Sequence, residues 1–174
     1  MGDSAMTVVA ILVAVIIMGV FPLMAMANEK DKTANLSAET ATTEFVNTIR
    51  TTGKITLNDY NNYVSRLSAT GNSFDTEITV QVLDENPSKK VTTGDQIGDN
   101  VYYTKYTTQI IEELASNPGG VIQLKEGDIV SVSAENTNIT IAQQLRNFMY
   151  KVTGNSSSVI TAEASGMVTT TGTN

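Results

Sequence analysis

The chain of 174 residues contains no cysteine, no histidine and no tryptophan, and it has only three prolines. Without cysteine it can form no disulfide, and without cysteine and histidine it lacks the ligands of ordinary zinc sites. The same absences exclude a cysteine nucleophile, a histidine base and a serine–histidine–aspartate triad. Several large classes of enzyme are therefore excluded by composition alone.

Positive charge is also scarce. The chain has 11 lysines and arginines against 18 aspartates and glutamates, a net charge of −7, and a pI near 4.5. Proteins that bind nucleic acids usually carry a basic face, so we expect no nucleic-acid partner. The adjacent pair Lys89 and Lys90 is too small to change this expectation. The length fits one domain, with room for an appendage.

One stretch lacks charge of either sign. Residues 5–27 form an apolar run of 23 residues without Asp, Glu, Lys or Arg. As a helix this run would span roughly 34 Å, enough for a hydrocarbon core of about 30 Å. A cleaved signal peptide would begin with basic residues and have a shorter apolar core, although residues 25–27 fit a cleavage site. We expect a retained single-pass membrane helix; a cleaved signal peptide and a helix buried in an assembly are the alternatives.

The flanks of this run leave its orientation open. Lys30 and Lys32 lie on the C-terminal side, and the positive-inside rule would place that side in the cytoplasm. The rest of the chain is acidic, free of cysteine and rich in Thr, Asn and Ser. That composition is typical of domains outside Gram-positive cells, which favours the opposite orientation.

The helical pattern continues past the apolar run. Five apolar residues recur at intervals of three or four and so share one helical face: Ala34, Ala38, Ala41, Phe45 and Ile49. Residues 23–52 contain no proline or glycine, and Gly53 suits a left-handed C-cap. We predict one helical rod, roughly 70 Å long, that ends near Arg50. Residues 1–52 then form the long helix and residues 53–174 a globular head.

The first part of the head has a helix and then a strand. A capping-box pattern at Thr56 predicts a helix whose apolar face is formed by Leu57, Tyr60, Val64 and Leu67. Strict alternation of apolar and polar residues predicts a strand over residues 74–82.

The second part of the head also contains both helices and strands. Residues 101–116 are ambiguous, because Tyr102–Tyr103 and Thr107–Thr108 suit a strand, and we favour a helix from about Thr104 to Ser116. We then predict a turn at residues 117–120 and a hairpin that pairs residues 121–124 with 129–134. A helix over residues 140–150 and a strand over residues 158–170 follow. The apolar residues of that last helix are Ile141, Leu145, Phe148 and Met149. The fold class is thus α+β, with four strands in a small antiparallel sheet and helices packed on one face.

Candidate reactive groups are few. Three acid pairs, Asp84–Glu85, Glu112–Glu113 and Glu126/Asp128, are expected to be solvated in turns or on helix surfaces. The loop at residues 95–100 has two carboxylates and lacks the spacing of a calcium loop. We therefore expect no enzyme, no catalytic residue, no cofactor, no metal site and no small-molecule substrate.

Small side chains in the apolar run favour association between helices. Ala10 and Ala14 have the small-xxx-small spacing that lets membrane helices approach closely. Asp3 lies just before the run, where the dipole of a helix favours negative charge. Pro22 lies late in the run, at a place where a membrane helix tolerates a kink. We take Asp3, Ala10, Ala14 and Pro22 as candidate assembly residues.

With these features the chain resembles pilin-like proteins of the type IV pilin and TadE-like kind, including those associated with secretion or conjugation in Gram-positive bacteria. The resemblance rests on Asp3, the uncharged run, Pro22 and an amphipathic extension that leads to a small α+β head. The stretches 45–82 and 125–152 also look like such proteins. By analogy, Asp3 would neutralise the α-amine of a neighbouring subunit inside a filament.

The expected function is structural. The chain would be a subunit of a pilus-like surface filament, assembled through its apolar helix with copies of itself or with other pilin-like subunits. It would lie in a bacterial membrane, in an extracellular surface filament, or in both. The same sequence would serve a single-pass accessory protein of a secretion or conjugation machine that never polymerises. A membrane-tethered enzyme or ligand-binding module would need a concave site with converging polar groups.

Overall fold

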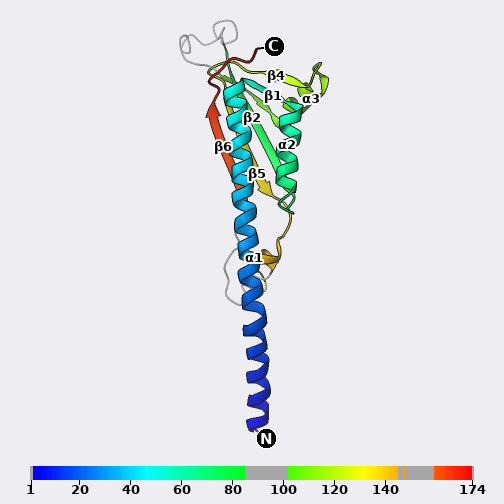
Figure 1. Cartoon of the computed structure of the whole chain (residues 1–174), viewed down its shortest axis with the longest axis vertical. Helices are drawn as coiled ribbons and strands as arrows, with labels where there is room; N and C mark the ends of the chain where they lie inside the picture. The colour runs from blue at the N-terminus through cyan, green and yellow to red at the C-terminus, as the bar shows by residue number, and fades with distance from the viewer. Residues whose placement is uncertain (1, 85–101, 145–146, 148–158, 174) are drawn as a thin grey trace, which may run out of the picture.

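The computed structural model describes residues 2–84, 102–144, 147 and 159–173. Its dominant element is α1 (Gly2–Thr52), a single helix of 51 residues, about 76 Å long at the usual rise per residue. The head is gathered around the C-terminal part of α1, and the N-terminal part projects away from it (Figure 1). The predicted α+β fold with a long N-terminal helix is therefore confirmed.

Helix α1 ends because Gly53 adopts a left-handed conformation. Gly53 has a φ of 66°, and its N–H donates to the carbonyl of Ile49 at 2.9 Å. This is the left-handed conformation that glycine adopts without a steric penalty at the end of a helix. The chain then forms β1 (Lys54–Thr56) and α2 (Leu57–Ser68). Thr56 caps α2, because its hydroxyl oxygen accepts from the N–H of Asp59 at 3.0 Å.

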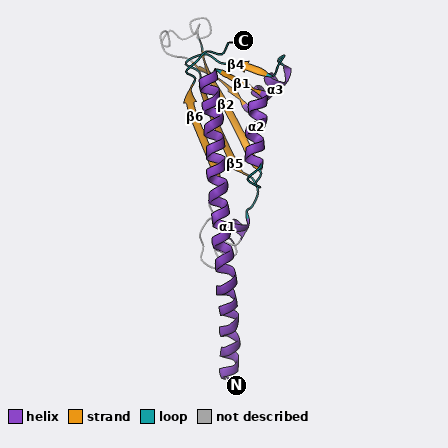
Figure 2. Ribbon diagram, in the orientation of Figure 1, coloured by secondary structure: helices purple, strands orange, loops and turns teal. Residues whose placement is uncertain are grey.

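The main sheet has four antiparallel strands in the order β3-β2-β5-β6. These strands are β2 (Phe74–Leu83), β3 (Tyr102–Tyr106), β5 (Ile129–Asn136) and β6 (Thr161–Met167). Helix α3 (Thr107–Ser116) follows β3, and β4 (Val121–Gln123) pairs with β1 in a separate sheet of two strands. Helix α1 runs along the sheet and contacts β5, β6 and α2 (Figure 2).

The core lies between α1 and the inner face of the sheet. Alternation along the strands buries Ile78 and Val80 of β2 and Val130 and Val132 of β5. All five residues of the predicted face of α1, from Ala34 to Ile49, are buried as well. The three alanines among them let the helix approach the strands closely, and removal of this apolar surface from water drives the packing.

The predicted hairpin is wrong. Residues 121–123 pair with β1, and β5 lies between β2 and β6. The backbone of Leu124 is held on both sides: its N–H donates to Gly53 at 2.8 Å and its carbonyl accepts from Gly172 at 2.9 Å. Both partners come from distant parts of the chain, so the strand cannot fold back onto β5.

The helix predicted from Thr104 begins later, because residues 102–106 form β3. The register pairs Tyr103 with Val82 and Tyr106 with Thr79. Pairing with the edge of β2 satisfies the backbone groups of these residues and outweighs their local helical pattern. The helix starts only at Thr107.

Two predicted apolar faces need correction. In α2 the buried residues are Tyr63 and Leu67, whereas Leu57 is 39% exposed. Near the end of the chain, residues 141–144 are helical, but Ile141 is exposed and its neighbours Ala142 and Gln143 are buried. Three further residues of that predicted face, Leu145, Phe148 and Met149, lie outside the described residues, as does the loop at 95–100.

Candidate functional site: the apolar arm of α1

The N-terminal part of α1 carries an unusual amount of exposed apolar surface. We call residues 5–26 the apolar arm. Most of its large side chains are exposed, from 48% at Val13 to 80% at Met18, and only Val20 and Met24 are partly buried. The other exposed ones are Met6, Val8, Val9, Ile11, Leu12, Val15, Ile16, Ile17, Phe21, Leu23 and Met26. A helix that is apolar on all sides is normally covered by lipid or by other protein.

Length and composition agree with this requirement. Within the part of the chain that the structure describes, α1 is the one helix long and apolar enough to cross a membrane, and no residue of its most apolar stretch of 18 is buried. Lipid has no water to satisfy backbone groups, and a continuous helix satisfies them internally. The arm therefore meets the physical requirements of a membrane-spanning segment.

The predicted assembly residues occupy different places on the arm. Ala10 and Ala14 line a shallow groove of about 690 Å³ together with Ala5, Met6, Val9, Val13 and Ile17. Pro22 lies inside α1, and the helix continues through it. Asp3 lies in the first turn of α1. The structure thus brings Ala10 and Ala14 together on one face of the arm, with Asp3 just before the arm and Pro22 in its last part.

The C-terminal end of α1 is fastened to the end of β6 and to the residues just after it. The carbonyl of Arg50 accepts from the N–H and the hydroxyl of Thr169, at 3.0 and 3.1 Å. The Arg50 Nε donates to the carbonyl of Met167 at 2.8 Å. Gly166 leaves room for this guanidinium, since a Cβ there would come within 2.6 Å of the Arg50 Cδ. Met167 and Thr169 are therefore hydrogen-bonded directly to the C-terminal end of α1.

Helix α2 fastens the middle of α1. The rings of Phe45 and Tyr63 stack with centroids 4.7 Å apart, and the Tyr63 hydroxyl lies 3.2 Å from the hydroxyl of Thr42. Burial raises the pKa of Tyr63 above its ordinary value, and the hydrogen bond to Thr42 opposes this in part. On the surface, Arg66 forms a hydrogen-bonded ion pair with Glu44, which lowers the pKa of the glutamate.

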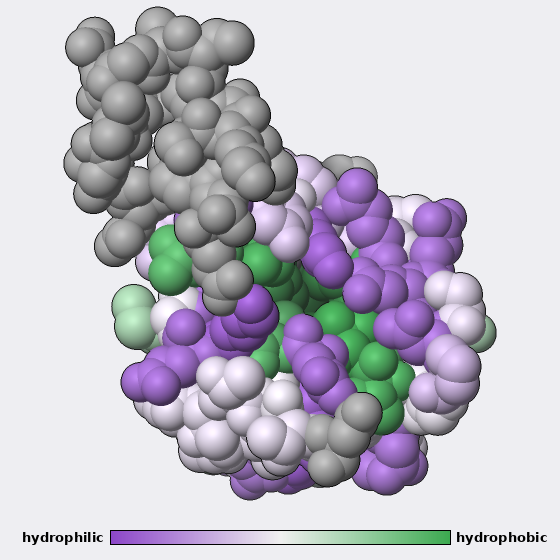
Figure 3. Space-filling view, turned by 90° about the horizontal axis from the view of Figure 1, so that it is seen from above, coloured by the Kyte–Doolittle hydropathy of each residue, from purple (hydrophilic) through white to green (hydrophobic). Residues whose placement is uncertain are grey.

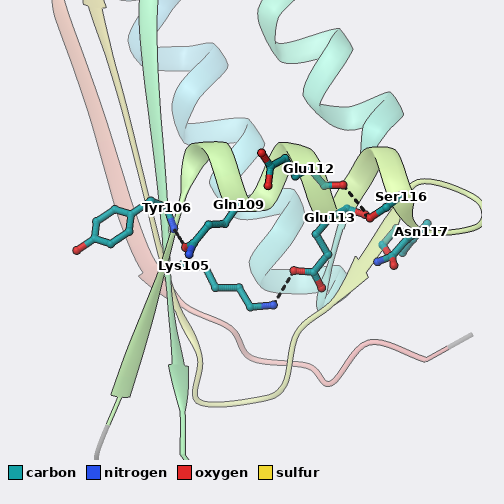
Figure 4. Close-up of polar contacts among 8 residues, drawn as sticks. Lys105, Tyr106, Gln109, Glu112, Glu113, Ser116 and Asn117 are labelled. Carbon is teal, nitrogen blue, oxygen red and sulfur yellow. Dashed lines mark hydrogen bonds and ion pairs between the residues drawn. The ribbon is translucent and has the colours of Figure 1, made fainter.

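One member of each of two predicted acid pairs, Glu113 and Asp128, has a structural partner. Glu113 forms an ion pair with Lys105 at 2.7 Å, across the junction of β3 and α3 (Figure 4). Asp128, predicted to be solvated, is buried. Its carboxylate accepts from the backbone N–H groups of Leu83 and Lys125, at 3.0 and 2.8 Å. This carboxylate shapes the turn before β5, a role that its position in a polar loop did not reveal.

The head presents a polar surface at the end farthest from the arm. Seen from above, hydrophilic and neutral residues surround apolar side chains that are set back in a hollow (Figure 3). Among the described residues, no group of three or more acidic side chains is placed to hold a metal ion.

The chain was also compared with known proteins. A scan against protein-family models finds no match, and searches of the curated proteins and of the solved structures find none either. The function must therefore be inferred from the residues themselves, and the feature that most needs a partner is the exposed apolar arm.

Proposed function

We propose that the protein is a structural subunit of a pilus-like surface filament, assembled through the apolar arm of α1. It would have no enzymatic activity. The observation that carries the proposal is the exposure of the arm on every side, in continuity with a helix whose other half is built into the head. Before assembly the arm would hold the subunit in a bacterial membrane as a single-pass anchor.

The shape of the arm supports packing against other helices. The groove beside Ala10 and Ala14 offers a face where a neighbouring helix can approach closely. Association of helices in lipid depends on such close packing, because lipid chains are as apolar as the side chains themselves. The partners would be copies of this chain or other pilin-like subunits.

The connection between arm and head also suits a filament. A load applied to the head would reach α1 through the hydrogen bonds of Arg50 with Met167, at the end of β6, and with Thr169 just after it. Filament subunits need such a path, because the arm holds the assembly together while the head is exposed to outside forces.

The test is electron microscopy of sheared surface material, with mass spectrometry of its polypeptides. We expect filaments that contain this chain in bulk with the arm present. Replacement of Ala14 by leucine should reduce filament yield at least several-fold, because the added side chain would hold neighbouring helices apart. The matched control is Val15→Leu on the opposite face of the arm, which should assemble normally.

Two outcomes would contradict the proposal. Filaments that lack this chain, with the protein confined to the membrane, would favour a non-polymerising accessory protein of a secretion or conjugation machine. A mature chain that begins after residue 27 would show that the arm is a cleaved signal peptide.

A further inference from the structure

The strongest unexplained feature outside the arm is a pair of exposed isoleucines at the base of the head. Ile139 and Ile141 are 64% and 67% exposed, more than any other large apolar side chain of the described head. Ile139 lies in the loop after β5 and Ile141 begins the helical turn at residues 141–144, which Figure 1 places beside α1, at the end of the head nearest the arm. Both line a pocket of about 420 Å³ together with Leu23 and Met26 of the arm.

The loop that carries these isoleucines is held in place by polar contacts, which keep both side chains exposed. The N–H of Thr140 donates to the side chain of Gln143 at 2.9 Å, and the N–H of Gln143 donates to the Thr140 hydroxyl at 3.2 Å. This reciprocal pair is a capping box, which starts the helical turn at Ile141. The Thr140 hydroxyl also donates to the carboxylate of Asp31 on α1, at 2.9 Å.

A second set of contacts holds the loop from the other side. The N–H of Ser73 donates to the Asn138 side chain at 2.7 Å, and the N–H of Thr137 donates to the Ser73 carbonyl at 2.9 Å. Thr140 and Gln143 are buried, while the isoleucines on either side of Thr140 face outward. The usual arrangement of a loop, with polar groups outside and apolar groups inside, is reversed here.

The position of the loop along α1 identifies what could cover it. If the apolar run is centred in a bilayer at Ile16, the rise of the helix places Leu23 and Met26 about 10 to 15 Å from the centre. The bond to Asp31 fixes Thr140 about 22 Å from the centre on the same scale. The boundary between acyl chains and headgroups lies between these two levels. Lys30, which also lines the pocket, lies about 21 Å from the centre, at the level of Thr140.

We propose that Ile139 and Ile141 form a second membrane contact, inserted into the acyl–headgroup boundary of the phospholipid layer beside α1. This proposal rests on the membrane anchoring included in the proposed function. The two isoleucines continue the apolar surface of the arm onto the head. Apolar side chains at this depth bind lipid by burying their surface in it. The contact would fix the height and the rotation of the head above the membrane before assembly.

The absence of tryptophan makes the test direct. Single tryptophans can replace Ile141, Phe21 and Tyr103 in turn in the full chain, reconstituted in phosphatidylcholine vesicles with brominated acyl chains. Phe21 marks the arm, and Tyr103 lies on β3 opposite Val82, near the far end of β2. We expect bromine to quench roughly half or more of the fluorescence at positions 21 and 141 and to leave position 103 unaffected. Ile139→Trp should behave like Ile141→Trp.

The outcomes separate this proposal from the anchoring on which it rests. Quenching at position 21 without quenching at positions 139 and 141 would overturn the second contact and leave the anchor in place. Quenching at none of the positions would contradict the anchor itself. Blue-shifted emission at position 141 without quenching would show that protein, such as a second copy, covers the isoleucines, and would overturn the lipid proposal. Quenching at position 103 as well would overturn it too, because the head would then lie flat on the membrane.

Discussion

The two halves of α1 belong to one uninterrupted helix but differ in how much of their apolar surface the head covers. In the apolar arm, most of the large side chains are exposed around the helix, and Ile16, for example, is 55% exposed. In the second half, the packed half (residues 27–49), a single face is buried, and alanines make up much of it. The sheet and α2 cover that face, and apart from the exposed Leu36 the other faces are formed by polar residues. A helix with one apolar stripe can bury that stripe against its own domain. A helix that is apolar on all sides must be covered by lipid or by other protein as well.

The sharpest way to test this contrast is to remove equal side chains from both halves. Ile49 is fully buried, so Ile49→Ala should lower the free energy of unfolding of the head by about 2 to 5 kcal/mol. Ile16→Ala should leave it unchanged, because Ile16 contacts nothing in the head. Urea denaturation of the full chain in detergent would measure both. Equal losses would mean that the arm contributes to the head after all.

Addition of bulk tests the same contrast in the opposite direction. Ala38 is fully buried between α1 and its neighbours, so Ala38→Leu should destabilise the head by about 1 to 3 kcal/mol through overpacking. Ala10→Leu should not change head stability, and its effect should appear in filament yield. Thermal unfolding followed by circular dichroism would compare them. An Ala38→Leu head as stable as the original would show that the packed half tolerates a wider spacing.

The smallest expected effect concerns the polar contact inside the packed half. The pKa of Tyr63 is raised above its ordinary value of 10.0, mainly by burial. The folded state therefore keeps the hydroxyl proton longer than the unfolded state. The resulting stability is complete below pH 10 and is lost as the pH rises from there through the higher folded pKa.

Tyr63→Phe checks this behaviour. At neutral pH the variant should be less stable by about 0.5 to 1.5 kcal/mol, because the hydrogen bond with Thr42 is lost. Above pH 10 its stability should fall less steeply than that of the original chain. Denaturation curves from pH 7 to strongly alkaline solution would show the difference. Tyr106→Phe, at a tyrosine that is 56% exposed, is the control and should leave the stability at neutral pH unchanged.

Local pattern predicted α1 well and the pairing of strands poorly. The apolar face from Ala34 to Ile49 and the stop at Gly53 follow from spacing of three and four residues and from one permissive residue. The partner of β4 could not be predicted in this way. It depends on bonds from Gly53 and Gly172 to Leu124, between residues far apart in the sequence.

The candidate site shows the same division. The apolar arm is visible in the sequence because it is continuous and uncharged. The two isoleucines were missed, because Ile141 was expected to face the core as part of a longer helix. The capping box at Thr140 and its bond to Asp31 turn the isoleucines outward. The Thr-x-x-Gln pattern at residues 140–143 agrees with the predicted start of this helix, but it does not show which of its faces is buried.

The sequence by itself determined that this protein has an apolar helix of membrane length, a long rod with one apolar face, and no thiol or imidazole chemistry. These properties depend on composition and on periodicity over a few residues. Only the tertiary structure decided which strands pair, that Asp128 is buried, and that two isoleucines line a pocket with Leu23 and Met26 of the arm. Those features arise from contacts between distant segments, whose free energies depend on the geometry of the whole fold.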